Sequence, residues 1–213
     1  MVALCYGLTP IIEVRMLPFS AACERNKEPI LDVLRIAFAD RLHVLEIGSG
    51  TGQHAVHFAE GLPHLTWHPT EQSTYLADLT ARVKLEGGRN LSAPTLLDVR
   101  QAVWPLRSVG AVFTANTLHI MSWPEVLALY KGLGSVLAPG GVMCVYGPFR
   151  YDGRYTSDSN QEFDQMLQQR DPQSGLRDIQ AVTALAGQYG LRLDADHDLP
   201  AYNRLLVFVK EPG

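Results

Sequence analysis

The 213-residue chain has few cysteines, no excess of basic residues and no long apolar run. Its three cysteines lie too far apart to form a CxxC metal pair or a disulfide framework, so we expect a reducing, cytoplasmic location. The 18 lysines and arginines against 22 aspartates and glutamates give a net charge of −4, which argues against binding of nucleic acid through a basic face. Because the sequence lacks a run of about 18 uncharged apolar residues, no segment is predicted to span a membrane.

The first 15 residues are fairly apolar, but their apolar positions follow no sustained period. They lack a basic start, and a proline and two charged residues interrupt them, so they are not predicted to be a signal peptide. Met16 stands just before the first segment with an organised pattern. We therefore expect residues 1–15 to be an N-terminal extension and residues 16–213 to form a single domain.

Apolar runs alternate with helical patterns through the first two thirds of the chain. The predicted strands cover residues 42–47, 65–68, 91–97, 109–115 and 142–146. The predicted helices cover residues 26–38, 53–60, 73–86 and 122–137. This alternation predicts an α/β fold with a parallel sheet.

The last third of the chain follows another pattern. Two further helices are predicted at residues 158–169 and 178–189. Two strands are predicted at residues 191–193 and 205–209, and their short connection permits an antiparallel pair but no parallel crossover.

A glycine-rich segment follows the first predicted strand and opens a helix. Ligands of α/β sheets bind beyond the carboxyl ends of the strands, where glycine lets the backbone approach them closely. The dinucleotide fingerprint GxGxxG requires Gly or Ala where Gln53 stands, which disfavours an NAD-dependent oxidoreductase. The loop residues expected to bind a cofactor are Glu46, Gly48, Ser49, Gly50 and Gly52.

Polar residues at the ends of the next three predicted strands complete this candidate site. Glu71 lies nineteen residues after Gly52, where an acidic side chain can accept the hydroxyls of an adenosine ribose. Asp98 can accept a hydrogen bond from an adenine amine, and the backbone N–H of Val99 can donate to the ring. Asn116, after the fourth strand, is expected to line the far side of the cofactor.

In this order, and with the turn at residues 137–141, these motifs resemble those of class I S-adenosylmethionine-dependent methyltransferases over about residues 40–147. A narrower resemblance covers most of the chain. The segment Ser-Ala-Ala-Cys-Glu-Arg-Asn-Lys-Glu-Pro-Ile at residues 20–30 resembles the N-terminal signature of the methyltransferase-like protein 26 family. The segments at residues 147–149, 175–178 and 199–203 also fit that largely uncharacterised family.

The resemblance implies a Rossmann-like fold with helices on both faces of a mostly parallel sheet of seven strands. The implied strand order is 3-2-1-4-5-7-6, with strand seven antiparallel. The implied cofactor is S-adenosylmethionine and the implied product S-adenosylhomocysteine, but the resemblance supplies no known substrate.

The favoured function is therefore methyl transfer to a small-molecule acceptor by a monomer or homodimer. Two alternatives stay open: a protein methyltransferase, and a cofactor-binding scaffold that acts through a partner without turnover. A nucleic-acid amino methyltransferase is disfavoured, because Asn-Thr-Leu-His at residues 116–119 replaces the Asn/Asp-Pro-Pro-aromatic motif.

Two residues are the candidates for catalysis, and a third group is expected to cover the cofactor. His119 is the histidine near the end of the fourth strand, and Tyr151 belongs to a group of tyrosines that can wall an acceptor pocket. Asn26 is expected to cap a helix, and with Lys27 to bind the cofactor's carboxylate as part of a lid ahead of that helix. No metal site is expected, because the histidines at residues 54–68 have no closed ligand spacing.

Overall fold

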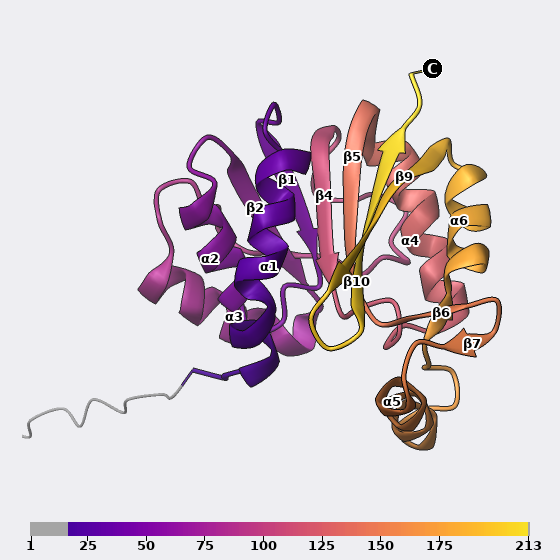
Figure 1. The fold of residues 1–213 in the computed structure, drawn as a ribbon. Helices are drawn as coiled ribbons and strands as arrows, with labels where there is room; N and C mark the ends of the chain where they lie inside the picture. The colour runs from indigo at the N-terminus through magenta and orange to yellow at the C-terminus, as the bar shows by residue number, and fades with distance from the viewer. Residues whose placement is uncertain (1–16, 213) are drawn as a thin grey trace, which may run out of the picture.

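The computed structural model describes residues 17–212, so the N-terminal extension expected at residues 1–15 lies outside the described residues (Figure 1). Its elements are α1 (Ala21–Ala37), β1 (His43–Ile47), α2 (Gln53–Gly61), β2 (Thr66–Glu71), α3 (Ser73–Glu86), β3 (Thr95–Leu96), β4 (Val109–Ala115), α4 (Trp123–Val136), β5 (Leu137–Gly147), β6 (Phe149–Tyr151), β7 (Arg154–Tyr155), α5 (Asp158–Arg170), β8 (Arg177–Asp178), α6 (Ile179–Gly187), β9 (Leu191–Leu199) and β10 (Asn203–Lys210). None of the helices in residues 17–212 is long and apolar enough to cross a membrane.

Seven strands form one sheet in the order β3-β2-β1-β4-β5-β10-β9. Strands β1 to β5 pair in parallel, whereas β10 runs antiparallel to both of its neighbours, β5 and β9. Since β9 and β10 are the sixth and seventh strands of this sheet along the chain, the predicted order 3-2-1-4-5-7-6 with an antiparallel seventh strand is confirmed.

Two hydrophobic cores lie on the two faces of the sheet, because successive side chains of a strand point to opposite faces. In β4, Ala111 and Phe113 pack with α1 and α2. Val112, between them, packs with α4 and α6 on the other face. The sheet is therefore a central layer with helices on both sides, as expected (Figure 1).

Helix α1 begins at Ala21, five residues earlier than predicted. Ser20 is its N-cap, because the Ser20 side chain accepts a hydrogen bond from the backbone N–H of Cys23. The prediction that Asn26 caps this helix and that Lys27 precedes it is therefore wrong: both lie inside α1. Serine and asparagine are comparable N-caps, so local preference did not distinguish the two starts.

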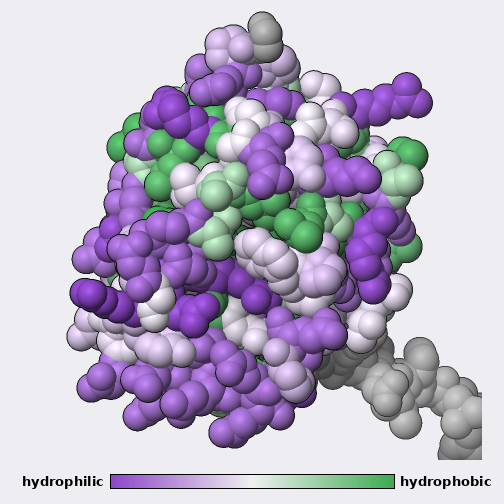
Figure 2. Space-filling model, turned by 90° about the vertical axis from the view of Figure 1, so that its right-hand side faces the viewer, coloured by the Kyte–Doolittle hydropathy of each residue, from purple (hydrophilic) through white to green (hydrophobic). Residues whose placement is uncertain are grey.

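A second, small sheet in the order β7-β6-β8 was not predicted, because its strands are only two or three residues long and carry no periodicity. It lies with α5 below the carboxyl edge of the main sheet, which is the lower edge in Figure 1. The surface at that lower end is largely hydrophilic, in keeping with the polar sequence of α5 (Figure 2).

The packing of α4 generates the first prediction. A Cβ atom added at Gly132 would lie 2.1 Å from the buried ring of Trp104, so Gly132→Ala forces a core side chain to move. We expect this change to lower the free energy of unfolding by about 1–3 kcal/mol in urea denaturation. Gly187, at the end of α6, has open space around it, and Gly187→Ala serves as the matched control that leaves stability unchanged or slightly raised. Equal stability of the two variants would contradict this account of the α4 packing.

Candidate functional site

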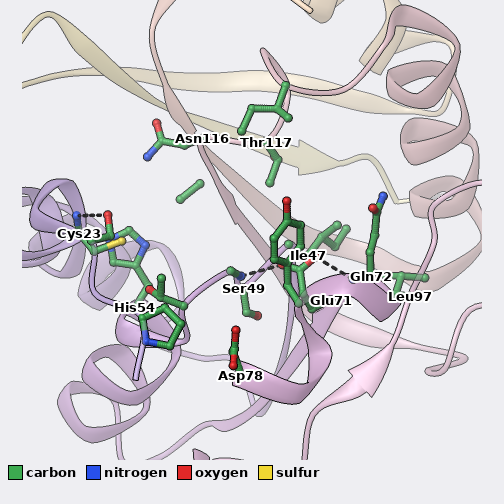
Figure 3. A pocket seen from close by; sticks show the side chains of 18 of the residues that line it. Cys23, Ile47, Ser49, His54, Glu71, Gln72, Asp78, Leu97, Asn116 and Thr117 are labelled. Carbon is green, nitrogen blue, oxygen red and sulfur yellow. Dashed lines mark hydrogen bonds between the residues drawn. The ribbon is translucent and has the colours of Figure 1, made fainter. Parts of the chain in front are cut away.

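A cavity of about 560 Å³ lies at the carboxyl edge of the sheet, where β1, β2 and β4 end (Figure 3). Its volume is in the usual range for small-molecule sites. The residues that line it are Pro18, Ser20, Cys23, Ile47, Gly48, Ser49, Gly50, Thr51, His54, Glu71, Gln72, Tyr75, Asp78, Leu97, Val99, Ala115, Asn116, Thr117, Ile120 and Met121.

The glycine loop forms the floor of this cavity. Gly48, Gly50 and Gly52 all have positive φ angles, of 71°, 53° and 77°, a backbone conformation that favours glycine. A Cβ at Gly48 would lie 2.6 Å from a methyl carbon of Thr117, whereas a Cβ at Gly50 would point into open space. The loop therefore needs glycine for its conformation, and at Gly50 it leaves room for a ligand against the backbone.

Glu71 joins the ends of β1 and β2. One oxygen of its carboxylate accepts a hydrogen bond from the backbone N–H of Gly50 at 2.7 Å, and the other accepts from the N–H of Gln72 at 2.7 Å. The side chain is buried at the wall of the cavity. Because each carboxylate oxygen has a second lone pair, Glu71 still has acceptor capacity for ligand hydroxyls.

Glu46 supports the loop from below and does not line the cavity. Its carboxylate accepts a hydrogen bond from Nε1 of Trp67 at 2.8 Å in the core between β1 and β2. Burial raises the pKa of Glu46 to about 7, and the negative charge of Glu71 acts in the same direction. Glu46 therefore joins β1 to β2 just before the loop, and it does not reach the cavity in this conformation.

The start of α1 forms one wall of the cavity, and two side chains fix it to the glycine loop. Gln53 accepts from the Ser20 N–H at 2.6 Å and donates to Glu24 at 2.9 Å. Arg82, from α3, donates to the carbonyl oxygens of Pro18 at 2.7 Å and Thr51 at 2.6 Å. These contacts place Pro18 and Ser20 beside the loop, although the sequence analysis expected Asn26 and Lys27 in that position.

One end of the cavity is apolar, and it corresponds to the predicted adenine site only in part. The buried Leu97 and Val99 line it, and the more exposed Tyr75 and Ile120 also line the cavity. Asp98 does not line it. Its carboxylate makes a bidentate pair with Arg100, whose Nε donates to Oδ1 and whose Nη2 donates to Oδ2, and this pair lowers the Asp98 pKa to about 2.

Asn116 and His119 lie at the ends of β4 and β5 but differ in access to the cavity. Asn116 lines the cavity and has a φ of 57°, so the chain turns sharply after β4. His119 is buried behind it, next to Gly147 and against the ring of Phe163. Burial lowers the His119 pKa to about 4, so the imidazole is neutral. His119 does not line the cavity, and it contributes no side chain to the site in this conformation.

Tyr151 is also placed away from the cavity. Its hydroxyl donates to the carboxylate of Asp196 on β9 at 2.7 Å, and the guanidinium of Arg204 lies over its ring. Burial and the Asp196 carboxylate raise the pKa of the Tyr151 hydroxyl. The predicted catalytic position of Tyr151 is not supported by this geometry, because its hydroxyl hydrogen is held by Asp196.

Asn26 and Lys27, predicted to bind the cofactor's carboxylate from a lid, do not face the cavity. Asn26 is buried, and its Oδ1 lies 2.7 Å from Nε2 of His54. Lys27 pairs with Glu24 at 2.7 Å and lines a separate groove between the helices. The lid was therefore misplaced: these residues belong to the packed helix α1.

Six of the eleven predicted cofactor residues line the cavity. They are Gly48, Ser49, Gly50, Glu71, Val99 and Asn116. Sequence reasoning missed other polar lining groups, among them Ser20, Cys23, His54 and Tyr75. A signal for His54 was present, because it stands two residues after the last glycine of the loop. Within residues 17–212, no three His, Cys, Asp or Glu side chains are grouped to hold a metal ion.

Residues 17–210 match the profile of a family described as proteins of unknown function, DUF938, so the chain belongs to that family. Among solved structures, an O-methyltransferase family protein from Burkholderia thailandensis has a TM-score of 0.77 at 17% sequence identity, and the match covers 90% of this chain and 58% of that one.

Two further matches are named small-molecule methyltransferases. Human N-acetylserotonin methyltransferase in complex with SAM has a TM-score of 0.75 at 14% identity, over 90% of this chain and 53% of that one. Mitomycin 7-O-methyltransferase has a TM-score of 0.75 at 15% identity, and the match covers 89% of this chain and 55% of that one. The chain thus spans little more than half the length of these proteins, and the likeness establishes the class I methyltransferase fold.

The buried carboxyl of Glu46 generates a prediction about pH. Its pKa is about 7 in the folded protein and near 4.5 when unperturbed, so the folded state binds this proton more tightly. Stability from this group is therefore present at low pH and falls as the pH rises from about 4.5 to 7. Glu46→Gln should melt several degrees higher than the unchanged protein at pH 8, and this difference should shrink at pH 5.

Thermal unfolding at the two pH values measures this effect. Glu60→Gln, at an exposed position of α2, is the control that should show no pH-dependent difference. A Glu46→Gln variant that is less stable than the unchanged protein at pH 8 would show that burial of the ionised carboxylate does not destabilise the fold.

Proposed function

We propose that this DUF938 protein transfers the methyl group of S-adenosylmethionine to a small-molecule acceptor. The observation that carries the proposal is the joining of the glycine loop to Glu71 through the Gly50 N–H, at the wall of a cavity of about 560 Å³. This arrangement sets an open backbone beside a carboxylate with free acceptor capacity, which suits a ribose. The class I methyltransferase fold of the chain and its solved neighbours supports the choice of cofactor.

The residues present fit this cofactor on two counts. A Cβ at Gly50 would occupy the open space above the loop, and Glu71 is oriented by two backbone N–H groups with lone pairs left over. Leu97 and Val99 offer an apolar surface for a flat base next to Glu71. We assign the ribose hydroxyls to Glu71 and the base to the apolar end. When bound, the cofactor supplies a methyl group on a cationic sulfur.

The acceptor is assigned to the side of the cavity formed by Asn116, Thr117 and Met121. These residues follow β4, and Figure 3 shows Asn116 and Thr117 across the cavity from Asp78 of α3. Positioning of two small reactants in one cavity supplies much of the rate enhancement that methyl transfer needs. A cavity of this size suits a small acceptor better than a protein side chain presented from a groove, which favours the small-molecule reading over a protein methyltransferase.

We also propose that the chain is a member of the methyltransferase-like protein 26 family. The segment at residues 20–30, which carries that resemblance, supplies the cap Ser20, the lining residue Cys23 and the buried Asn26. We further propose that the protein works in a reducing compartment as a monomer or homodimer, and only the compartment is supported by the few, widely spaced cysteines.

The direct test of the proposal is binding and turnover. Calorimetry should detect S-adenosylhomocysteine but not NAD. Incubation with S-adenosylmethionine labelled in its methyl group and a metabolite extract should transfer label to a small molecule. Binding of NAD without binding of S-adenosylhomocysteine would overturn the proposal, and label on protein alone would favour a protein methyltransferase.

Glu71 provides a residue-level prediction. Glu71→Ala should weaken S-adenosylhomocysteine binding about tenfold or more, because loss of a charged hydrogen-bond acceptor costs about 1.5–3 kcal/mol. Glu71→Gln keeps an oxygen for the Gly50 N–H and should weaken binding less. Asp32→Ala, at an exposed position of α1, is the control with unchanged affinity. Unchanged affinity in Glu71→Ala would place the ribose elsewhere.

The domain boundary provides a second prediction. A chain that begins at Met16 should fold and bind S-adenosylhomocysteine as the whole chain does, because the family match begins at residue 17. Circular dichroism melting and calorimetry on both chains measure this. A shortened chain that fails to fold would show that residues 1–15 belong to the domain.

A further inference from the structure

The imidazole of His54 has a defined tautomer. His54 lies in the first turn of α2, is only 5% exposed and lines the cavity. Its Nε2 is 2.7 Å from Oδ1 of Asn26. Because an amide oxygen can only accept, Nε2 carries the hydrogen, and Nδ1 of the neutral ring keeps its lone pair.

The ring is held from several sides, so this tautomer is also fixed in direction. Asn26 is itself buried in α1, and its side chain acts on the Tyr146 hydroxyl at the end of β5, where it partly offsets the rise in pKa that burial causes. Phe58 stacks on the imidazole at 5.0 Å between ring centroids and 13° between planes, and Phe113 meets it edge-on at 6.2 Å. Within residues 17–212, the His54 imidazole makes a hydrogen bond to Asn26 and to no other residue.

The position of His54 in the cavity separates it from the proposed ribose site. Figure 3 shows His54 and Cys23 on one side of the cavity, across from Glu71 and Leu97. A ligand that holds its ribose at Glu71 therefore has its other end toward His54. The lone pair of Nδ1 is a hydrogen-bond acceptor at that end.

The protonation state of the His54 imidazole decides whether it serves as a hydrogen-bond acceptor or as a general base. Burial lowers the His54 pKa to about 4, and the charges of His57 and Lys27 act in the same direction while Glu24 opposes them. A cationic ligand in the cavity lowers it further. The ring therefore stays neutral near pH 7, where it accepts a hydrogen bond but is a poor general base.

We propose, resting on the proposed function, that His54 accepts a hydrogen bond from an N–H or O–H group of a ligand in the cavity, and that Asn26 is the positioning residue that fixes its tautomer. Two sources have this chemistry: the ammonium group at the amino-acid end of the cofactor, and the N–H or O–H of the methyl acceptor. This assigns a purpose to the buried Asn26, which acts through His54 and not on the ligand directly.

Two substitutions of similar size separate the two nitrogens of the ring. Asn places its amide near the position of Nδ1, and Gln places it near Nε2. His54→Asn therefore keeps an acceptor toward the cavity and loses the bond to Asn26, whereas His54→Gln does the reverse. His57→Gln, on the same helix but paired with Glu28 outside the cavity, is the matched control.

Calorimetry with two probes tests whether the ammonium group of the cofactor donates the hydrogen bond to His54. S-adenosylhomocysteine carries the amino-acid end, and 5′-methylthioadenosine lacks it. If the ammonium group is the donor, His54→Gln weakens S-adenosylhomocysteine binding about tenfold, His54→Asn weakens it less, and neither changes the affinity for 5′-methylthioadenosine. If the methyl acceptor instead donates the hydrogen bond to His54, the affinities for both probes stay unchanged. His54→Gln then loses label transfer to the metabolite extract at saturating cofactor.

Asn26→Asp tests the positioning role with a pH readout. A carboxylate beside the ring favours the imidazolium, which has no lone pair to offer. In this variant the affinity for S-adenosylhomocysteine should be weak at pH 6 and recover toward pH 8. If the methyl acceptor donates the hydrogen bond to His54, label transfer should show this pH dependence instead. The unchanged protein should show little change over this range. Thermal melting confirms that each variant is folded, and Asn26→Ser supplies a neutral replacement if Asn26→Asp does not fold.

The outcomes separate this inference from the proposed function. If the unchanged protein binds neither probe, the proposed function fails. If it binds both, and His54→Gln matches His57→Gln in both affinities and in label transfer, the inference about His54 is overturned while the proposed function stands.

Discussion

The carboxylate of Glu71 is the contact on which the candidate site depends. It accepts the N–H groups of Gly50 and Gln72, and in this way it ties the loop after β1 to the end of β2. A loop with three glycines in positive-φ conformations has little intrinsic stiffness, so its shape comes from such external contacts. The same carboxylate faces the cavity, so one side chain both shapes the floor of the site and remains available to a ligand.

The wall beside this loop is built from the start of α1, a segment distant in sequence. Gln53 and Arg82 satisfy the backbone groups of Ser20, Pro18 and Thr51, which leaves few polar groups unpaired where three elements meet. Gln53 also occupies the position at which a dinucleotide-binding loop has a small residue. In this chain the larger amide connects the loop to the start of α1 through Ser20 and Glu24.

The strands and helices of the main sheet followed from local signals in the sequence, whereas the order of the strands in the sheet was implied by the family resemblance. Buried runs such as residues 109–115, glycine turns and helical spacing each arise within a few residues, and their order along the chain restricts the topology. The start of α1 was wrong because Ser20 and Asn26 are equally good caps, and packing of Ile30 and Leu31 does not distinguish them. The strands β6, β7 and β8 are too short to carry a periodic signal.

For the site, local sequence indicates where the backbone turns, because glycines and an acidic residue stand at the strand ends beside the cavity. Which side chains reach the cavity depends on packing between distant segments of the chain. The Asp98 carboxylate pairs with Arg100 and the Tyr151 hydroxyl with Asp196, and neither side chain lines the cavity. His54 and Asn26 are 28 residues apart, and they meet because α1 and α2 bury their apolar faces on the same side of the sheet, a contact that no local pattern encodes.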